Sequence, residues 1–403
     1  MKANATHPFF PSLSREGTQS RRMWGEFFLI FSACICLFSF TQIAYAQPKQ
    51  DPGLILSGVS RNDLVGIQSI DNSKSIGRQM DFAGSNLLTL DMRSAISSQV
   101  KIDGSVDLWL FTGAYADAIR QTDSSSILPI LQTTSAVVIA DIRKLYASLY
   151  LPLADISVGR QIISFGQGMV FSPIDVFSTV NILDLSLRRS GSDVARVRVP
   201  FGDLSGIDAI AKSTSQKDGA AAAIKAYSHA GCFDFSGIGI YQGAQNEAIT
   251  GVTFKGDLVA GVYGELVEHW HEGGDRFFVG MLGTDYSIEN QWFFTAEYMF
   301  NERAQINQIP AQLSLLETSI PLTHHHYGFV NARYKINDIM NVSASAIADI
   351  TAQSGIFTAQ YFYNILQNAN IILYVQYYPA SMNGLLPQNV GTATYGLRIE
   401  VAF

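Results

Sequence analysis

Seven charged residues lie close together in one stretch of the sequence, and both signs are represented. They are Asp175, Asp184, Arg188, Arg189, Asp193, Arg196 and Arg198. Carboxylates and guanidinium groups that face each other across a narrow water-filled space produce a transverse field, which orients polar solutes and selects ions by sign. These residues are therefore the candidate constriction of a pore. The alternative is that they are simply hydrated in a wide lumen.

Other kinds of chemistry have weaker support. His269 and His271 form a His-x-His pair between two glutamates, and three histidines occupy 324–326. Imidazole suits zinc, copper or nickel, but the sequence fixes no third ligand, so exposed loop polarity is the better interpretation and no metal is expected. No G-x-S-x-G, H-E-x-x-H or P-loop pattern occurs. We expect no enzyme activity and no cofactor, although a Ser/His/Asp set like that of a barrel phospholipase stays an alternative.

The elements that position these residues are long alternating segments. Residues 395–403 place Tyr395, Leu397 and Ile399 on one face and Arg398 and Glu400 on the other. Such segments run for about 9–12 residues, whereas strands of soluble proteins average about 5–6. That length suits tilted strands that cross a membrane, which is possible only in a closed barrel with an apolar outer and a polar inner face. The charged residues expected to face the lumen are Asp91, Arg93, Asp107, Glu265, Glu297, Arg333, Lys335, Asp349, Arg398 and Glu400.

We count eighteen such segments, with sixteen as the alternative, and the fold class is an all-β transmembrane antiparallel barrel. The long connections all follow odd-numbered segments, as expected when outer loops are long and periplasmic turns short, and both termini are then periplasmic. The predicted strands are 56–70, 86–100, 102–115, 141–150, 154–163, 193–200, 204–212, 219–228, 231–242, 246–255, 258–268, 276–287, 291–301, 325–335, 340–349, 355–363, 370–378 and 395–403.

The two ends of the chain support an exported protein. Arg21 and Arg22 precede a short apolar run, and Ala44-Tyr45-Ala46 matches a cleavage pattern, so residues 1–46 are predicted to be a signal peptide with an extended first region and 47–403 the barrel. Only one of the three cysteines then remains, which excludes an internal disulfide. Phe403 ends the last strand and resembles the C-terminal assembly signal of outer-membrane barrels.

One stretch carries a family resemblance. Residues 159–177 match the pattern G-R-Q-x3-[WF]-G-x-G-x4-P-x-D-x-F through Gly159, Arg160, Gln161, Gly166, Gly168, Pro173 and Asp175. This stretch resembles one found in Gram-negative outer-membrane porins, some of them related to alginate-export barrels. The resemblance implies a barrel in the outer membrane.

The connection 164–192 is the third predicted outer loop. Val180, Leu183 and Leu187 have helical spacing, Ser178 or Thr179 could cap a helix, and Asp184 and Arg188 are four residues apart and could pair. A loop with its own apolar stripe needs a surface to cover, so it could fold against the inner wall and narrow the lumen. The alternative is an outward loop packed on its neighbours. Arg160 departs from the scheme because it shares the face of apolar residues; a bulge at Gly159 could turn it inward, or it could lie at the membrane edge.

Together these features favour a porin-like channel for passive diffusion of small hydrophilic solutes in a Gram-negative outer membrane. The alternative is a dedicated export or uptake conduit for an anionic polysaccharide or another specific substrate. Charged residues make up only 15% of the chain and the net charge is −7, which argues against an ordinary soluble enzyme and against nucleic-acid binding. The expected partners are outer-membrane lipid, the barrel-assembly machinery, small solutes and further copies of the chain.

Overall fold

The computed structural model describes residues 53–70, 80–121, 129–178, 180–181, 184–212, 220–303, 324–379 and 391–403. The predicted signal peptide lies outside the described residues. Among the described residues, no helix is both long and apolar enough to cross a membrane.

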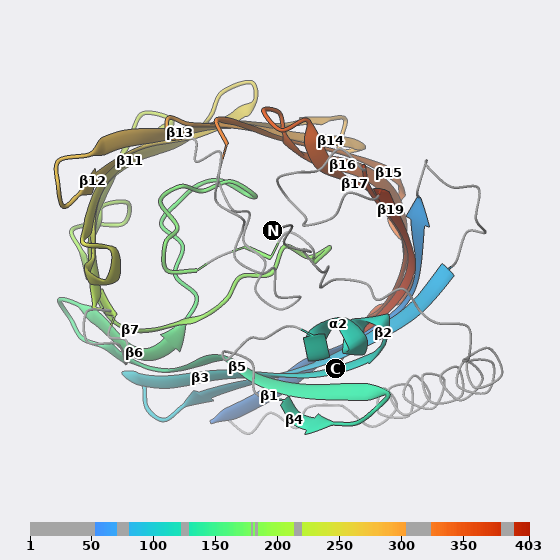
Figure 1. Cartoon of the computed structure of the whole chain (residues 1–403). Coiled ribbons are helices and arrows are strands. Elements are labelled where there is room, and N and C mark those ends of the chain that lie inside the picture. Colours follow the sequence, from blue (N-terminus) through green and yellow to red (C-terminus); the bar gives the residue numbers. More distant parts are fainter. Residues whose placement is uncertain are drawn as a thin grey trace, which may run out of the picture.

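Eighteen antiparallel strands form a closed barrel, as the alternation predicts, and the sixteen-strand alternative is wrong. The ring closes where β1 and β19 pair over a long register from Val59–Ala402 to Ile70–Gly391. Figure 1 shows the ring viewed along its axis. Its strands are β1 (Leu54–Ile70), β2 (Met80–Ala95), β3 (Val100–Gly113), β5 (Ala136–Tyr150), β6 (Asp155–Gln161), β7 (Ser192–Pro200), β8 (Gly206–Lys212), β9 (Ala221–Ala230), β10 (Phe233–Gln242), β11 (Glu247–Asp257), β12 (Gly261–His271), β13 (Arg276–Ile288), β14 (Trp292–Asn301), β15 (His326–Asn337), β16 (Met340–Asp349), β17 (Ser354–Leu366), β18 (Ala369–Tyr378) and β19 (Gly391–Ala402).

Three further elements were not predicted from the sequence. The short strand β4 (Pro129–Gln132) pairs with Val137–Ile139 of β5. Strand β6 pairs with a later part of β5, Leu145–Tyr150. Helix α2 (Ala114–Gln121) follows β3, and a 3-10 helix, η1 (Gly243–Gln245), joins β10 to β11. In Figure 1, α2 lies on the inner side of the ring. It packs against Phe111, Val137 and Ile139 of β3 and β5.

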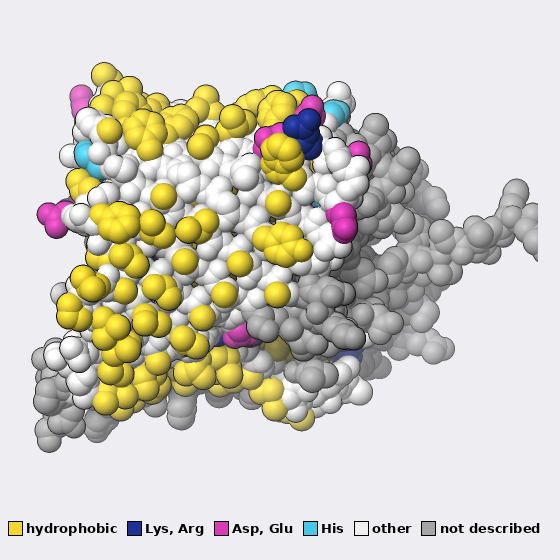
Figure 2. All heavy atoms as spheres, turned by 90° about the vertical axis from the view of Figure 1, so that its left-hand side faces the viewer, with side chains coloured by type: hydrophobic (Ala, Val, Ile, Leu, Met, Phe, Trp, Pro, Cys, Tyr) yellow, Lys and Arg dark blue, Asp and Glu magenta, His cyan; other side chains and the backbone are white. Residues whose placement is uncertain are grey.

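The outer face of the barrel is apolar. Leu266, Leu282 and Tyr298 are exposed on neighbouring strands, and Figure 2 shows hydrophobic side chains spread over one outer side. Aromatic residues stand near both ends of this band: Trp292 stacks with Phe294 and packs on Tyr334, while Phe278 packs on Phe300 toward the other end. A lipid-facing band between two aromatic girdles is typical of a membrane barrel.

The short turns and both described ends lie at one rim. The amide of Gly58 donates to the carbonyl of Phe403, and the amide of Ala95 donates to the carbonyl of Gly53. The turns at this rim are brief, as at 151–154, 201–205, 258–260 and 289–291. The assignment of this rim to the periplasm stays a prediction.

The inner face is less polar than the alternation predicts. Ile238 and Ile240 of β10, Ile249 of β11 and Val267 of β12 are buried on it. The expectation of a wholly polar inner face is wrong here, because a segment of the chain covers these residues and replaces water as their neighbour.

Candidate functional site

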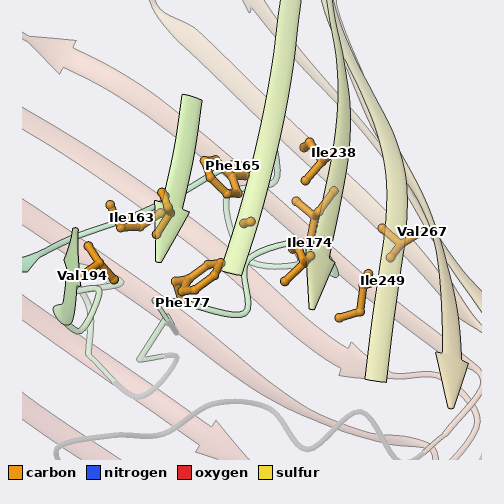
Figure 3. Close-up of a cluster of buried hydrophobic side chains, with 11 residues drawn as sticks. Ile163, Phe165, Ile174, Phe177, Val194, Ile238, Ile249 and Val267 are labelled. Atoms are coloured by element: carbon orange, nitrogen blue, oxygen red, sulfur yellow. The ribbon is translucent and has the colours of Figure 1, made fainter. Parts of the chain in front are cut away.

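The connection between β6 and β7, residues 162–191, is the candidate site, and we call it the inserted segment. Figure 1 shows it in green within the ring of strands. Ile163, Phe165, Ile174 and Phe177 form a buried cluster with inner-face residues of β7 to β12, drawn in Figure 3. Further along, Val170 and Phe171 join a second cluster with Tyr263, Met299 and Tyr327. Apolar packing therefore holds the segment against a wide arc of the wall.

Glu265 of β12 binds the backbone of the inserted segment. Its Oε1 accepts from the amides of Gln167 at 2.6 Å and Gly168 at 3.0 Å. Its Oε2 accepts from the Ser172 hydroxyl at 3.1 Å and from the Ile174 amide at 3.4 Å. A carboxylate has two oxygens and no donor, so it can accept all four bonds.

Glu297 of β14 does the same for the next residues. The amide of Met169 donates to its Oε1, and the amides of Val170 and Phe171 donate to its Oε2 at 3.0 Å each. The Tyr263 hydroxyl completes the set at 3.0 Å. Backbone inside a barrel has no strand partner, and these two carboxylates satisfy its amides instead.

Asp175 folds the segment on itself. It accepts from the amides of Phe165 and Gly166 and from the Ser164 hydroxyl, and Arg189 pairs with it. A Cβ at Gly166 would overlap the Ser172 hydroxyl, and one at Gly168 would overlap the carbonyl oxygen of Phe171. The two glycines of the motif are therefore needed for close approach. Pro173, the next motif residue, is buried between the donors Ser172 and Ile174.

The first part of the motif lies at the foot of the inserted segment. Gly159 has φ +126°, and a Cβ there would overlap the carbonyl oxygen of Leu145. Arg160 stays in register with Leu145, so no bulge turns it inward. Arg160 pairs with Asp193 at 2.9 Å and donates to the carbonyl of Ile142. Ile142 lies in the part of β5 that does not pair with β6. Gln161 is buried and accepts from the Ser157 hydroxyl.

The end of the inserted segment reaches a different part of the wall. Arg188 pairs with Asp107 of β3 and lies over the Trp109 ring. Asp184 contacts Arg398 of β19 at 3.5 Å, and Arg398 also pairs with Asp63 of β1 through two bonds of 2.8 and 3.1 Å. Asp184 and Arg188 therefore have separate partners, and the expected pair between them is wrong. The expected helix is also wrong for the described residues, because Val180 pairs with Arg189 in an antiparallel bridge and residues 185–186 form a turn.

Six of the seven candidate constriction residues lie on the inner side, but they do not converge on one point. Arg196 of β7 pairs with Asp208 of β8 at 2.8 Å, and Arg198 lies 4.0 Å from the same carboxylate. Asp193 alternates with Val194, which packs under the inserted segment, so it lies on the outer face with Arg160. Arg188 and Arg189 thus have separate carboxylates, Arg196 and Arg198 share Asp208, and the transverse field is divided among these local groups.

The remaining predicted lumen charges have nearby partners of several kinds. Asp91 lies 3.5 Å from Arg143, Glu400 pairs with Arg61, and Asp349 contacts His324 at 2.6 Å. Two others use partners close in the chain or on the next strand: Arg333 lies over the Phe293 ring and Lys335 pairs with Asp338. Arg93 lies 3.6 Å from Asp103 and is largely exposed.

The histidine groups pair with carboxylates. His269 contacts Glu247 at 2.8 Å and His271 contacts the same oxygen at 3.3 Å, while both rings stack on Phe277. Among the described residues, no group of three or more His, Cys, Asp or Glu side chains is arranged to hold a metal ion.

Sequence reasoning missed Asp63, Asp208, Arg143 and α2. Asp208 lies between Ile207 and Ala209 in a predicted strand, and that alternation would have identified it. Asp63 follows Arg61 and Asn62, so the pattern around it does not alternate. Arg143 is different, because the register of β3 and β5 shifts between Ser105 and Val106 and places Arg143 beside Ser105 and Asp107. Simple alternation assigns a bulged residue to the wrong face.

No family model matches this sequence, and no curated protein is similar to it. Solved structures share its fold. OccK1 (OpdK) of Pseudomonas aeruginosa superposes with a TM-score of 0.54 at 8% identity, over 86% of this chain and 98% of that one; OpdK has also been solved with vanillate, at the same score and coverage. OpdL of Pseudomonas aeruginosa gives 0.54 at 9% identity, over 87% and 98%. OccAB4 of Acinetobacter baumannii gives 0.52 at 8%, over 86% and 98%. At such low identity these likenesses establish the barrel fold alone.

Proposed function

We propose that this protein is an outer-membrane channel for the passive diffusion of small hydrophilic solutes. The observation that carries the proposal is a closed barrel with an apolar outer face whose interior holds charged side chains and a firmly bound inserted segment. A lumen lined by ion pairs is a path for water and polar solutes, and a segment across it limits their size.

The outer membrane is the proposed location because closed barrels of this kind span lipid only when every backbone group is paired within the ring. The pairing of β1 with β19 closes the ring. The apolar band would contact outer-membrane lipid, and the last strand with Phe403 would be bound by the barrel-assembly machinery. Signal-peptide cleavage near Ala46 would precede insertion.

The inserted segment is the proposed constriction. Its contacts with Glu265 and Glu297 hold it away from the rim and beside the lumen wall. In OpdK, vanillate is the small molecule named with the structure. A small polar solute of comparable size is the kind of cargo proposed here.

The test is conductance of the purified, refolded protein in a planar bilayer. Steady ohmic current without added substrate supports the diffusion channel. A silent barrel that conducts only with a partner protein, or one that a single polysaccharide blocks, would instead support the dedicated conduit. Heat-modifiable gel mobility provides the folding control for both outcomes.

A further inference from the structure

The inserted segment has two parts that are bound to the barrel in different ways. Residues 163–178 form the anchored part, and residues 184–188 form what we call the tip. The anchored part binds β7 to β17, whereas the tip binds β1, β3, β18 and β19. Since β14 and β3 lie about half-way round the ring from each other, the segment crosses the lumen and touches both sides.

Helix α2 and the tip pack on the same hydrophobic cluster of the far wall. Leu185 packs on a buried cluster of Val65, Ile67, Ala83 and Tyr374, and Tyr115 of α2 packs on the same cluster. Two separate insertions, one after β3 and one after β6, therefore converge at this wall. Leu187 packs instead on the cluster that contains Val170 and Phe171, so the tip is also attached to the anchored part.

The wall partners of the tip keep other partners when the tip leaves. Arg398 would retain Asp63, with its two shorter bonds. Asp107 would retain the Thr89 hydroxyl at 2.6 Å and Arg143 at 3.8 Å. Breaking a buried ion pair is costly mainly when it leaves a charge without a partner. Release of the tip would leave both Arg398 and Asp107 with other partners.

The anchored part is built in the opposite way. Among the described residues, the hydrogen-bond donors to Glu265 all belong to the inserted segment: Gln167, Gly168, Ser172 and Ile174. Glu297 would keep only the Tyr263 hydroxyl of the donors described above. Departure of this part would strand two buried carboxylates, so it stays in place.

We propose that the tip is a releasable gate that closes against α2, while the anchored part is a fixed constriction. This inference rests on the proposed channel function. In the closed arrangement Leu185 and Tyr115 cover the passage beside β1 and β18. In the open arrangement Asp184, Leu185 and Arg188 leave the wall, and Leu187 keeps the tip attached to the anchored part.

Single-channel recording in a planar bilayer tests the gate. The variant Asp184→Ala/Leu185→Ala/Arg188→Ala removes both ion pairs and the apolar contact of the tip with the far wall. It leaves one bond, in which Arg398 donates to the Ser186 hydroxyl at 3.3 Å. Leu282→Ala, which truncates an exposed leucine on the outer face, is the matched control. We expect the wild type to move between a lower and a higher conductance level, the triple variant to remain at the higher level, and the control to behave as wild type.

Each other outcome has a definite meaning. A wild-type barrel that is folded but silent would overturn the proposed function. A wild type that conducts, with a triple variant of identical levels and dwell times, would overturn the gate alone. The triple variant could instead show a conductance level that is never recorded for the wild type. The tip would then be a fixed part of the constriction, and the gate proposal would be overturned. Tyr115→Ala provides an independent arm, because it truncates the opposite face and should lengthen the dwell time at the higher level.

Discussion

Replacing the carboxylates of Glu265 and Glu297 should loosen the backbone of the inserted segment without unfolding the barrel. In Glu297→Gln, one oxygen is lost, and with it the acceptor for two donors; Oε2 alone accepts from Val170 and Phe171. A buried donor without a partner costs about 1–3 kcal/mol, so two cost at least about 2 kcal/mol. Glu265→Gln removes a comparable pair.

That magnitude is measurable as amide exchange. Because about 1.4 kcal/mol is a factor of ten, the amides of residues 167–171 should exchange at least about 30-fold faster in either glutamine variant. Hydrogen exchange with mass spectrometry in detergent measures this for peptides that cover the segment. Exchange in the strands should be unchanged, because the apolar clusters and the ladders remain.

The control and the refutation are equally specific. Glu289→Gln changes an exposed glutamate in a turn and should leave exchange of the inserted segment as in wild type. If the Glu265 and Glu297 variants also leave residues 167–171 protected, in barrels that retain heat-modifiable mobility, then these carboxylates do not hold the segment. The reasoning that separates an anchored part from a tip would then be wrong.

Three further predictions concern selectivity, strain and pore size. Arg196→Ala/Arg198→Ala removes both arginines beside Asp208, so the reversal potential in a salt gradient should shift toward cations. The shift should weaken at 1 M salt, where the Debye length is about 3 Å. An unchanged potential would place this pair outside the ion path. Gly159→Ala forces an L side chain to φ +126°, which should destabilise the barrel by about 1–3 kcal/mol in thermal unfolding, while Gly237→Ala, with open space around it, should not. Deleting residues 172–187 should raise single-channel conductance, and an unchanged conductance would mean that the segment does not limit the pore.

The strand count could be predicted because each strand has one face toward the outside and one toward the lumen, so its apolar and polar residues alternate. Side chains point to the two faces in turn, and in the last strand the outward Tyr395 and Leu397 separate inward Gly396 and Arg398. The same rule predicted that Glu265 and Glu297 face inward, where they bind the inserted segment. All eighteen predicted strands are present, and their boundaries differ from the observed ones by at most six residues.

The partners of these charges could not be predicted, because pairing across the closure depends on register. Arg398 and Asp63 are 335 residues apart and meet only because β1 and β19 close the ring with these two residues opposite each other. Asp107 and Arg188 meet only because the tip crosses the lumen. A sequence pattern gives the face of a residue but not its neighbour on another element.

The apolar part of the inner face was missed, although a signal was present. In residues 277–282, Phe278 and Leu282 lie on one face and Val279 and Met281 on the other, so both faces are apolar. A strand that is apolar on both faces predicts cover on both. The outer cover proposed here is lipid, and the inner cover is the inserted segment.

The apolar inner face and the two buried glutamates solve one physical problem together. Side chains such as Val170 and Phe171 exclude water from the wall, and the amides of the same residues then lose water as an acceptor. Glu297 supplies the acceptor from the wall, and Glu265 does so for the preceding turn. These two carboxylates are therefore occupied by the backbone, so in the proposed channel ion selection would depend on more exposed charges, such as Arg198. The candidate constriction that the sequence predicts thus divides into four residues that build the segment, two arginines on the inner wall of β7, and Asp193 on the outer face.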